Sequence, residues 1–318
     1  MNHALNSRML GWLPIEWQDR LGAIRRYRLL GARGSSHAIL ARVDGTTFHG
    51  GLTDRWKGII SLYALSKATK RDFRLLYTFP FQLTDYQVPA AYDWQLREGE
   101  LSENVFQVTL KRLIGDPSLQ RVQRLAPDKQ IHGYANRDWM DAINETYHTQ
   151  FTWGELFREL FTPSVRLNAA LEPYRKRLNK PYIAVAFRTQ NLFGDYTEYH
   201  YQPADATRQA QVIQSCLSFL QELHAKEGFS ILVTSDSERL AEQCATLPFV
   251  TASCGKAAHA DTSANSPQEQ YLKSFVDFYL LAEAQAVYCA GTKEMYPSDF
   301  PKYAAKVYDV PFHRVALD

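Results

Sequence analysis

The first part of the chain alternates between the apolar spacing of strands and that of helices. Residues 37–43, "HAILARV", are typical of a strand, and residues 53–69 repeat apolar side chains every three or four positions, as a helix does. Residues 73–79, "FRLLYTF", predict a second strand. The order of strand, turn, helix and strand is a βαβ unit, so we expect parallel strands in a sheet covered by helices.

The middle of the chain gives a weaker signal. Residues 82–130 contain short segments and turn residues, and they predict no clear element. Helical patterns follow between residues 136 and 179. We expect Thr162 to cap the last of these helices and Pro163 to occupy its first position.

Strands and helices alternate from residue 180 onward. The predicted strands are residues 182–187, 229–235, 248–253 and 286–291. An alternation of this kind is typical of a doubly wound parallel sheet. We therefore predict an α/β protein of two Rossmann-like domains that face a cleft. Residues 1–179 would form an acceptor-side domain with a leading helical segment, and residues 180–318 would form a nucleotide-sugar donor domain.

The composition limits the class of protein. The chain has 318 residues, of which 45% are hydrophobic and 22% charged, and its net charge of +2 offers no strong field for nucleic acid. The four cysteines form no C-x-x-C pair, which argues against structural zinc and disulfides and favours a reducing cytosol. No apolar run reaches the roughly 18 residues that span a bilayer. The N-terminus lacks the order of a signal peptide, so we expect a cytoplasmic protein.

Residues 8–33 combine tryptophans and leucines with several arginines. One interpretation is a basic amphipathic segment that rests on a membrane, which would place the protein at the periphery of the inner membrane. The other is a helix that packs on the body of the protein, with its arginines in solvent. We favour the packed helix and keep weak membrane contact as the alternative.

Polar residues follow the predicted strands of the second half, at the sheet edge where such folds bind ligands. They are Arg188, Ser235, Asp236, Thr292, Lys293 and Ser298. A guanidinium matches phosphate oxygens and keeps its charge, and hydroxyls with free N–H groups at a helix start cradle phosphate. The pattern predicts a diphosphate site. A surface ion pair for Arg188 and a helix cap for Asp236 are the structural alternatives.

Several motifs are absent from the sequence. It contains no G-x-G-x-x-G, no G-x-x-x-x-G-K-[ST], no G-x-S-x-G and no H-E-x-x-H. An Asp-x-Asp pair of the kind that holds a metal-bridged diphosphate is also missing. A metal-free diphosphate site built from arginine and helix starts remains.

Four segments resemble motifs of the fucosyltransferase superfamily, whose members have the GT-B fold. "GGLTDRWKGIISLYALSKATKRDFRLLY" resembles the first motif, and "IAVAFRTQNLFGD" resembles the central arginine motif. "ILVTSDSERL" and "FVDFYLLAEAQAVYCAGTKEMYPSDFPKYAAK" resemble the donor-site segments, and all four run in family order. The resemblance implies a metal-independent, inverting glycosyltransferase without cofactors. Its donor would be GDP-fucose, and its acceptor a glycan of a surface polysaccharide or lipopolysaccharide.

The resemblance also implies roles for donor-site residues. Arg188 would grip the β-phosphate and stabilise the departing GDP, with Lys293 or Arg55 as helper. Thr292 and Ser298 would bind phosphate oxygens. Three further residues would lie near the nucleoside or support that site: Ser235, Asp236 and Asp277.

The glycine turn before the first helix would bring Gly51, Asp54 and Arg55 to the cleft, because glycine lets the backbone pass close to a ligand. A capped helix with a surface ion pair is the alternative. Inverting transfer needs a base for the acceptor hydroxyl, and Asp195 is our first choice and Asp54 the second. The acceptor would lie on nearby rings, for which core packing is the alternative. These are Tyr196, Tyr199 and His200.

The sequence departs from the family pattern in three places. Ala186 and Phe187 stand where the family has a histidine ahead of the arginine. The spacing from Arg188 to the next acid is longer, and "GTKEMYPSD" replaces a serine-rich turn. Two alternatives therefore stay open: a GT-B transferase with a UDP or CMP donor, and a non-catalytic protein that binds nucleotide or carbohydrate.

Overall fold

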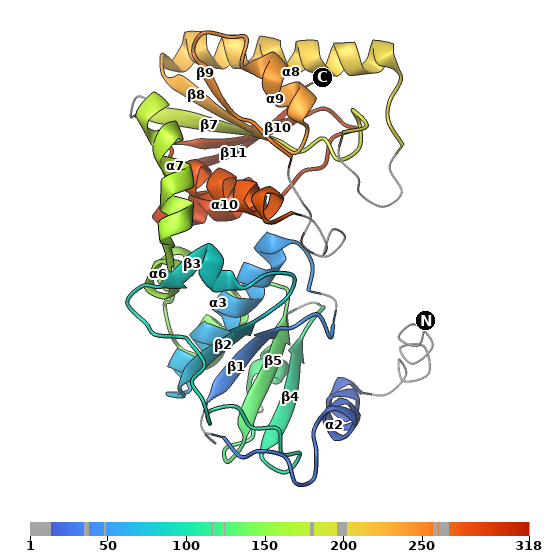
Figure 1. The fold of residues 1–318 in the computed structure, drawn as a ribbon, viewed down its shortest axis with the longest axis vertical. Coiled ribbons are helices and arrows are strands. Elements are labelled where there is room, and N and C mark those ends of the chain that lie inside the picture. The colour runs from blue at the N-terminus through green and yellow to red at the C-terminus, as the bar shows by residue number, and fades with distance from the viewer. Residues whose placement is uncertain are drawn as a thin grey trace. The chain divides into compact units, whose positions relative to one another are not determined.

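The computed structural model describes residues 14–34, 38–47, 49–115, 117–123, 125–178, 181–195, 202–256, 260 and 267–317. The chain forms two compact units, each with its own parallel sheet (Figure 1). One unit contains residues 1–50, 54–79 and 89–152, and the other contains residues 51–53, 80–88 and 153–318.

The first unit contains a four-stranded parallel sheet in the order β2-β1-β5-β4. Its elements are α2 (Ile15–Arg26), β1 (Ile39–Val43), α3 (Leu52–Ala68), β2 (Phe73–Tyr77), β4 (Val108–Leu113), α4 (Leu119–Gln123), β5 (Gln130–Ala135) and α5 (Met140–Tyr147). Gly133 of β5 faces Leu62 of α3, whereas its neighbour Tyr134 packs in a cluster with Ala23 of α2. Because side chains alternate along a strand, α3 and α2 cover opposite faces of this sheet.

The predicted βαβ unit corresponds to β1, α3 and β2. The strands β4 and β5 fall in the segment that gave no clear signal. In β5, Gln130, His132 and Tyr134 all point to one face, where they join a hydrogen-bonded network. A strand whose covered face is polar lacks the apolar run by which buried strands are recognised.

The second unit contains a five-stranded parallel sheet in the order β11-β10-β7-β8-β9. Its strands are β7 (Tyr182–Phe187), β8 (Ser230–Ser235), β9 (Val250–Ser253), β10 (Val287–Gly291) and β11 (Phe312–Ala316). Its helices are α6 (Trp153–Leu160), α7 (Val165–Arg177), α8 (Ala206–Glu227), α9 (Glu238–Cys244), α10 (Gln268–Ala282) and α11 (Phe300–Tyr308). Helices α8 and α9 cover one face of the sheet, and α10 lies on the other with α7 beside it (Figure 1). The predicted doubly wound arrangement is confirmed.

The division of the chain differs from the predicted seam near residues 179–181. Residues 80–88 and 153–178 group with the second unit. The Tyr86 ring stacks on Phe275 of α10 with 4.5 Å between centroids, and the Gln87 amide donates to the Tyr279 hydroxyl at 2.9 Å. The segment contains a 3-10 turn (Leu83–Asp85) and begins β3 (Gln87–Pro89). The sequence shows where strands resume, but not which sheet the preceding helices cover.

The start of α7 also differs from the prediction. Thr162 and Pro163 belong to β6 (Phe161–Pro163), which pairs with β3, so neither begins the helix. The cap is Ser164, whose side chain accepts a hydrogen bond from the Leu167 N–H. Pairing with β3 keeps the backbone extended for three residues after α6 and moves the helix start along the chain.

Candidate active site

The strand order of the second unit fixes where a ligand would bind. The chain moves outward from β7 to β8 and β9, and then returns to β10 on the other side of β7. Open α/β sheets bind ligands at such a switch point, beyond the carboxyl ends of the strands. Arg188 follows β7 and Thr292 follows β10. The two loops are joined where the Tyr296 N–H donates to the Arg188 carbonyl at 3.0 Å.

A buried carboxylate holds the loop after β7. Asp236 follows β8, and its side chain is 4% exposed. One oxygen accepts from the Thr189 N–H and hydroxyl at 2.7 and 2.8 Å. The other accepts from the Gln190 N–H at 2.7 Å and from the Arg188 guanidinium at 2.9 Å. The sequence predicted Asp236 near a nucleoside, whereas the structure commits it to residues 188–190.

Two consequences follow for the loop. Gln190 has φ of +53°, a left-handed conformation that a non-glycine residue adopts at an energetic cost, and the bond to Asp236 helps to hold it there. The Arg188 side chain keeps 20% of its surface exposed while one of its nitrogens is fixed by Asp236. A charged donor oriented in advance needs little reorganisation when it meets an anion.

A second buried group lies beneath the end of β8. The Lys273 amine donates to Asp277 at 2.6 Å and to the Ser235 carbonyl at 3.2 Å, and the Ser253 hydroxyl donates to the other oxygen of Asp277. Burial raises the pKa of Asp277, against the lowering effect of Lys273. The group joins α10 to the ends of β8 and β9, so it supports the loop that contains Asp236.

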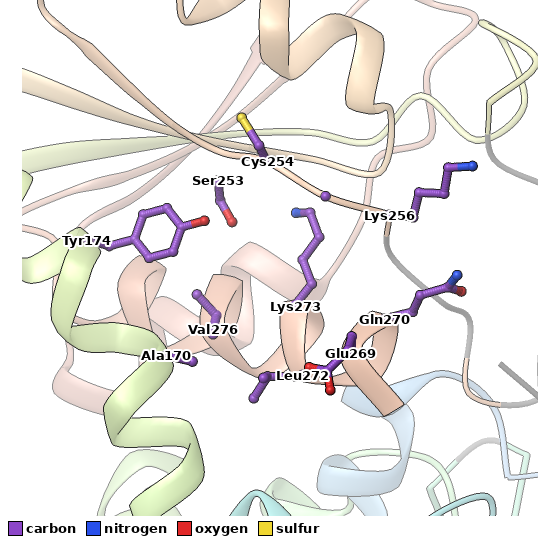
Figure 2. Close-up of a pocket in the computed structure, with 11 residues that line it drawn as sticks. Ala170, Tyr174, Ser253, Cys254, Lys256, Glu269, Gln270, Leu272, Lys273 and Val276 are labelled. Atoms are coloured by element: carbon purple, nitrogen blue, oxygen red, sulfur yellow. The ribbon is translucent and has the colours of Figure 1, made fainter. Parts of the chain in front are cut away.

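A pocket of about 310 Å³ opens beside this buried group. It lies between α7, α10 and the residues that follow β9, and it is lined by Tyr174, Ser253, Lys256, Gln270 and Lys273, among others. Figure 2 shows the Lys273 amine and the Tyr174 hydroxyl turned toward Ser253. The volume is at the lower end of the range for small-molecule sites, and apolar carbons share the lining with these polar groups.

The loop after β10 contains its own ion pair. The Thr292 hydroxyl donates to Glu294 at 2.7 Å, and two Arg208 nitrogens donate to the same carboxylate. The hydrogen bonds from Arg208 and Thr292 lower the pKa of Glu294 to about 2. The Thr292 hydroxyl, which the resemblance expects to bind a phosphate oxygen, therefore donates its hydrogen bond to the Glu294 carboxylate. Ser298 accepts from the Phe300 N–H at 3.1 Å at the start of α11, and Lys293 is exposed.

Asp195, the first choice for a base, lies at the start of α9. Its carboxylate accepts from the Ser237 hydroxyl at 2.7 Å and from the Arg239 N–H at 3.1 Å. The contacts describe a helix-capping residue, and the catalytic role stays a prediction. The expected acceptor residues, Tyr196, Tyr199 and His200, lie outside the described residues.

The glycine turn before α3 requires a correction. Arg55 is completely buried, and its guanidinium donates to the Gly50 carbonyl at 3.1 Å and the Phe79 carbonyl at 2.5 Å. It therefore ties the turn to the end of β2 and does not present its charge to a ligand. Asp54 pairs with Lys57 at 3.3 Å, and its side chain is 42% exposed. Gly51 is partly buried at the helix start.

Sequence reasoning missed some residues of this region. Lys273 stands four residues before Asp277 on one helix, a spacing at which side chains meet, and that spacing was a usable signal. Thr189 and Ser253 gave no signal, because short hydroxyl residues after strands are common and their partner comes from a distant segment. Arg208 and Glu294, 86 positions apart, were equally hidden.

Two features are absent from the part of the chain that the structure describes. That part of the chain holds no group of three or more His, Cys, Asp or Glu side chains that would suit a metal ion. Among its helices, none combines the length and the apolar character needed to cross a membrane.

Comparison with known proteins supplies the fold. No protein-family profile matches the chain, and no curated protein is similar to it in sequence. A structure of mutant Arabidopsis thaliana FUT1 in complex with GDP superposes with a TM-score of 0.55 over 96% of this chain and 76% of that one, at 12% identity. The chain shares the fold of FUT1. This confirms the GT-B-like fold class, and at this identity it shows the fold alone.

Two further structures are similar more weakly. NodZ alpha-1,6-fucosyltransferase soaked with GDP-fucose gives a TM-score of 0.49 at 14% identity, covering 86% of this chain and 93% of that one. POFUT1 in complex with GDP gives 0.47 at 10% identity, covering 90% and 99%. Scores below 0.5 add no support, so the fold rests on the FUT1 match.

Proposed function

We propose that the chain is a glycosyltransferase that takes its sugar from a nucleoside diphosphate sugar, and that this donor is GDP-fucose. The observation that carries the proposal is Arg188, a part-exposed guanidinium at the switch point of a parallel sheet, fixed by the buried Asp236. The FUT1 structure with the same fold contains GDP, which supports the choice of nucleotide. The motif resemblance supports fucose.

The chemistry follows from charge. Breaking the bond between sugar and diphosphate leaves negative charge on the diphosphate, and a pre-oriented guanidinium stabilises that charge as it develops. Lys293, which is exposed in the loop after β10, would add a second positive charge. Thr292 and Ser298 would bind phosphate oxygens, with Glu294 leaving Thr292 when the donor arrives. With these groups the transfer would need no metal.

The nucleoside would occupy the pocket beside Lys273. The Lys273 amine bonds the Ser235 carbonyl, and the next residue, Asp236, bonds Arg188. The pocket and the guanidinium therefore both adjoin the end of β8, and in this proposal the donor extends from one to the other. A volume of about 310 Å³ suits a single base or nucleoside rather than a larger cofactor.

The acceptor would be a glycan of a surface polysaccharide or lipopolysaccharide, and the transfer would invert the sugar. Two carboxylates remain candidates for the base. Asp54 is 42% exposed, whereas Asp195 uses one oxygen to cap α9. Loss of a general base lowers the rate about 10²- to 10⁴-fold. Asp54→Asn and Asp195→Asn would separate the two. The variant that lacks the base should lose turnover and still bind the donor.

The test compares melting temperatures with GDP, UDP, CMP and GDP-fucose in the wild type, Arg188→Ala and Arg97→Ala. Arg97 is the matched control, because it is an exposed arginine paired with Asp93 in the first unit. A ligand at about 100 times its Kd adds about 2.7 kcal/mol of stability. We expect a shift of several degrees with GDP and GDP-fucose that disappears only in Arg188→Ala.

The other outcomes are equally informative. A shift with UDP or CMP alone would refute GDP-fucose as the donor and would leave the assignment of the fold unchanged. The hydrogen bond between Thr292 and Glu294 favours one alternative, a protein that binds nucleotide without turnover. Release of GDP from GDP-fucose distinguishes the two: a transferase releases GDP slowly to water even without its acceptor, whereas a binding protein shows the shift and no release.

A further inference from the structure

The first unit exposes large apolar side chains along α2 and in the segments beside its C-terminal end. They are Trp17 at 55%, Ile24 at 65%, Leu29 at 66%, Leu30 at 99% and Phe106 at 68% exposure. Surfaces that gather exposed large apolar side chains mark interaction sites with proteins or membranes. We call these five residues, together with the exposed arginines described below, the basic–apolar patch.

The backbone brings the two parts of the patch together. Residues 28–32 lie along residues 103–106: the Arg28 N–H donates to the Glu103 carbonyl at 3.0 Å, and the Val105 N–H donates to the Arg28 carbonyl at 3.0 Å. The Asn104 amide donates to the Leu29 carbonyl at 3.0 Å. Phe106 therefore lies beside the turn that carries Leu29 and Leu30.

Exposed arginines lie on the same chain segment as four of the five apolar side chains. The exposed arginines are Arg20, Arg25, Arg28 and Arg33. Glu103 is an exposed acid on the facing segment, so arginine outnumbers it. The guanidinium of Arg20 also lies 5.3 Å from the centre of the Trp17 ring, which places charge next to the aromatic side chain.

The opposite side of α2 is fixed to the sheet, so the patch cannot turn inward. Asp19 is buried and pairs with Arg112 of β4 at 2.6 Å. Ala23 and Tyr27 pack with Val108 and Leu110 in a small core cluster. The packed helix expected from the sequence is thus present, and its outer side still presents apolar and basic groups together.

We propose that the basic–apolar patch docks the protein on the surface of a membrane that contains anionic lipid. A leucine exposed at 99% has almost no neighbouring wall against which a partner's side chain would pack, but it can enter the boundary between headgroups and acyl chains. Arginines beside it reach lipid phosphates while their stems stay in apolar surroundings. The charge of the patch selects anionic over neutral lipid.

The experiment is flotation of the full chain with vesicles of phosphatidylcholine alone or with about one third phosphatidylglycerol. We expect binding only to the anionic vesicles and release at high salt, because salt screens the arginines. Each basic residue near an anionic surface contributes about fivefold to partitioning, so Arg28→Glu with Arg33→Glu lowers it more than about twentyfold. Leu30→Asp lowers it at least several-fold.

The controls carry the same changes elsewhere. Val165→Asp alters an apolar residue that is 89% exposed on α7. Lys226→Glu with Lys302→Glu reverses the charge at two exposed lysines of the second unit. We expect the controls to bind as the wild type does. All variants should keep the wild-type melting temperature without vesicles.

Three results would overturn the proposal. The first is no binding to anionic vesicles, and the second is equal binding to neutral ones. The third is a dimer in gel filtration that the patch variants dissociate, which would assign the patch to a second copy of the chain. None of these bears on nucleotide binding, so the proposal is independent of the donor site.

Discussion

We predict that His132 makes the first unit sensitive to acid. The ring is buried in β5, and its Nδ1 lies 2.6 Å from the Tyr27 hydroxyl and 3.1 Å from the Arg42 guanidinium. Its Nε2 lies 2.8 Å from the Gln130 side-chain oxygen, which itself accepts from the Ser102 N–H. Arginine can only donate, so Nδ1 accepts and Nε2 carries the single proton. The network fits a neutral ring.

Burial, followed by the charge of Arg42, lowers the pKa of His132 from 6.5 to about 3. Below about pH 6.5 the His132 side chain therefore binds a proton in the unfolded chain, whereas in the folded protein it binds one only near pH 3. The contribution of the neutral ring to the free energy of unfolding is fully present above pH 6.5 and decreases as the pH falls through this window. One pH unit corresponds to about 1.4 kcal/mol, so at about pH 4.5 the loss is between 2 and 3 kcal/mol.

The assay is urea unfolding at several pH values between about 7 and 4.5, for the wild type and His132→Gln. Glutamine does not titrate, so the variant should lose the part of the pH dependence that His132 causes, even if it is less stable at neutral pH. Burial raises the pKa of Asp44, but hydrogen bonds from Thr46 and the charge of Arg42 lower it overall from 3.8 to about 2. Both pKa values lie below this window, so Asp44 adds little to the pH dependence measured there. Parallel pH curves for the two proteins would refute the reasoning, as would a charged His132 ring in NMR spectra of the folded protein near pH 5.

Three further predictions concern the second unit. Asp236→Asn turns an amide NH₂ toward donors of residues 188–190, so we expect a loss of about 3 kcal/mol in chemical unfolding and a weaker nucleotide shift; an unchanged shift would show that Asp236 does not position Arg188. Lys273→Met leaves the buried Asp277 without its cation and should cost about 3 kcal/mol, most of which Lys273→Met with Asp277→Asn should restore; equal losses in both would exclude an unpaired charge as the cause. Gly154→Ala puts a Cβ 2.0 Å from the Lys306 carbonyl oxygen, so α6 and α11 must separate at a cost of about 1 to 3 kcal/mol, measured as a lower melting temperature. An unchanged melting temperature would refute the tight packing of α6 on α11 at this glycine.

The sequence alone determined most of the second unit. The strands β7, β8 and β10 are apolar runs that end in polar residues, and a pattern of that kind needs only local reading. The position of Arg188 at a strand end followed from the same reading. The fold class followed from the alternation of strands and helices together with the order of the motifs, and the FUT1 match confirms it.

The first unit shows where local reading fails. Arg55 reads as a charged residue at a glycine-rich helix start, which suits a ligand site. In the structure, carbonyls of Gly50 and Phe79 meet its guanidinium, and Phe79 is 24 positions away. The sequence near Arg55 does not indicate that a backbone carbonyl 24 positions away will accept a hydrogen bond from its guanidinium.

Only the tertiary structure decided how the polar residues are used. Asp236 was readable as a helix cap or a ligand contact, and the structure shows that it holds the loop after β7, because parallel pairing brings the ends of β7 and β8 side by side. Lys273 and Ser253 became partners of Asp277 only when α10 packed under β8 and β9. The sequence shows which residues are charged and where the apolar strands end. Which charges meet depends on strand order and helix packing, since these bring together residues that are tens of positions apart.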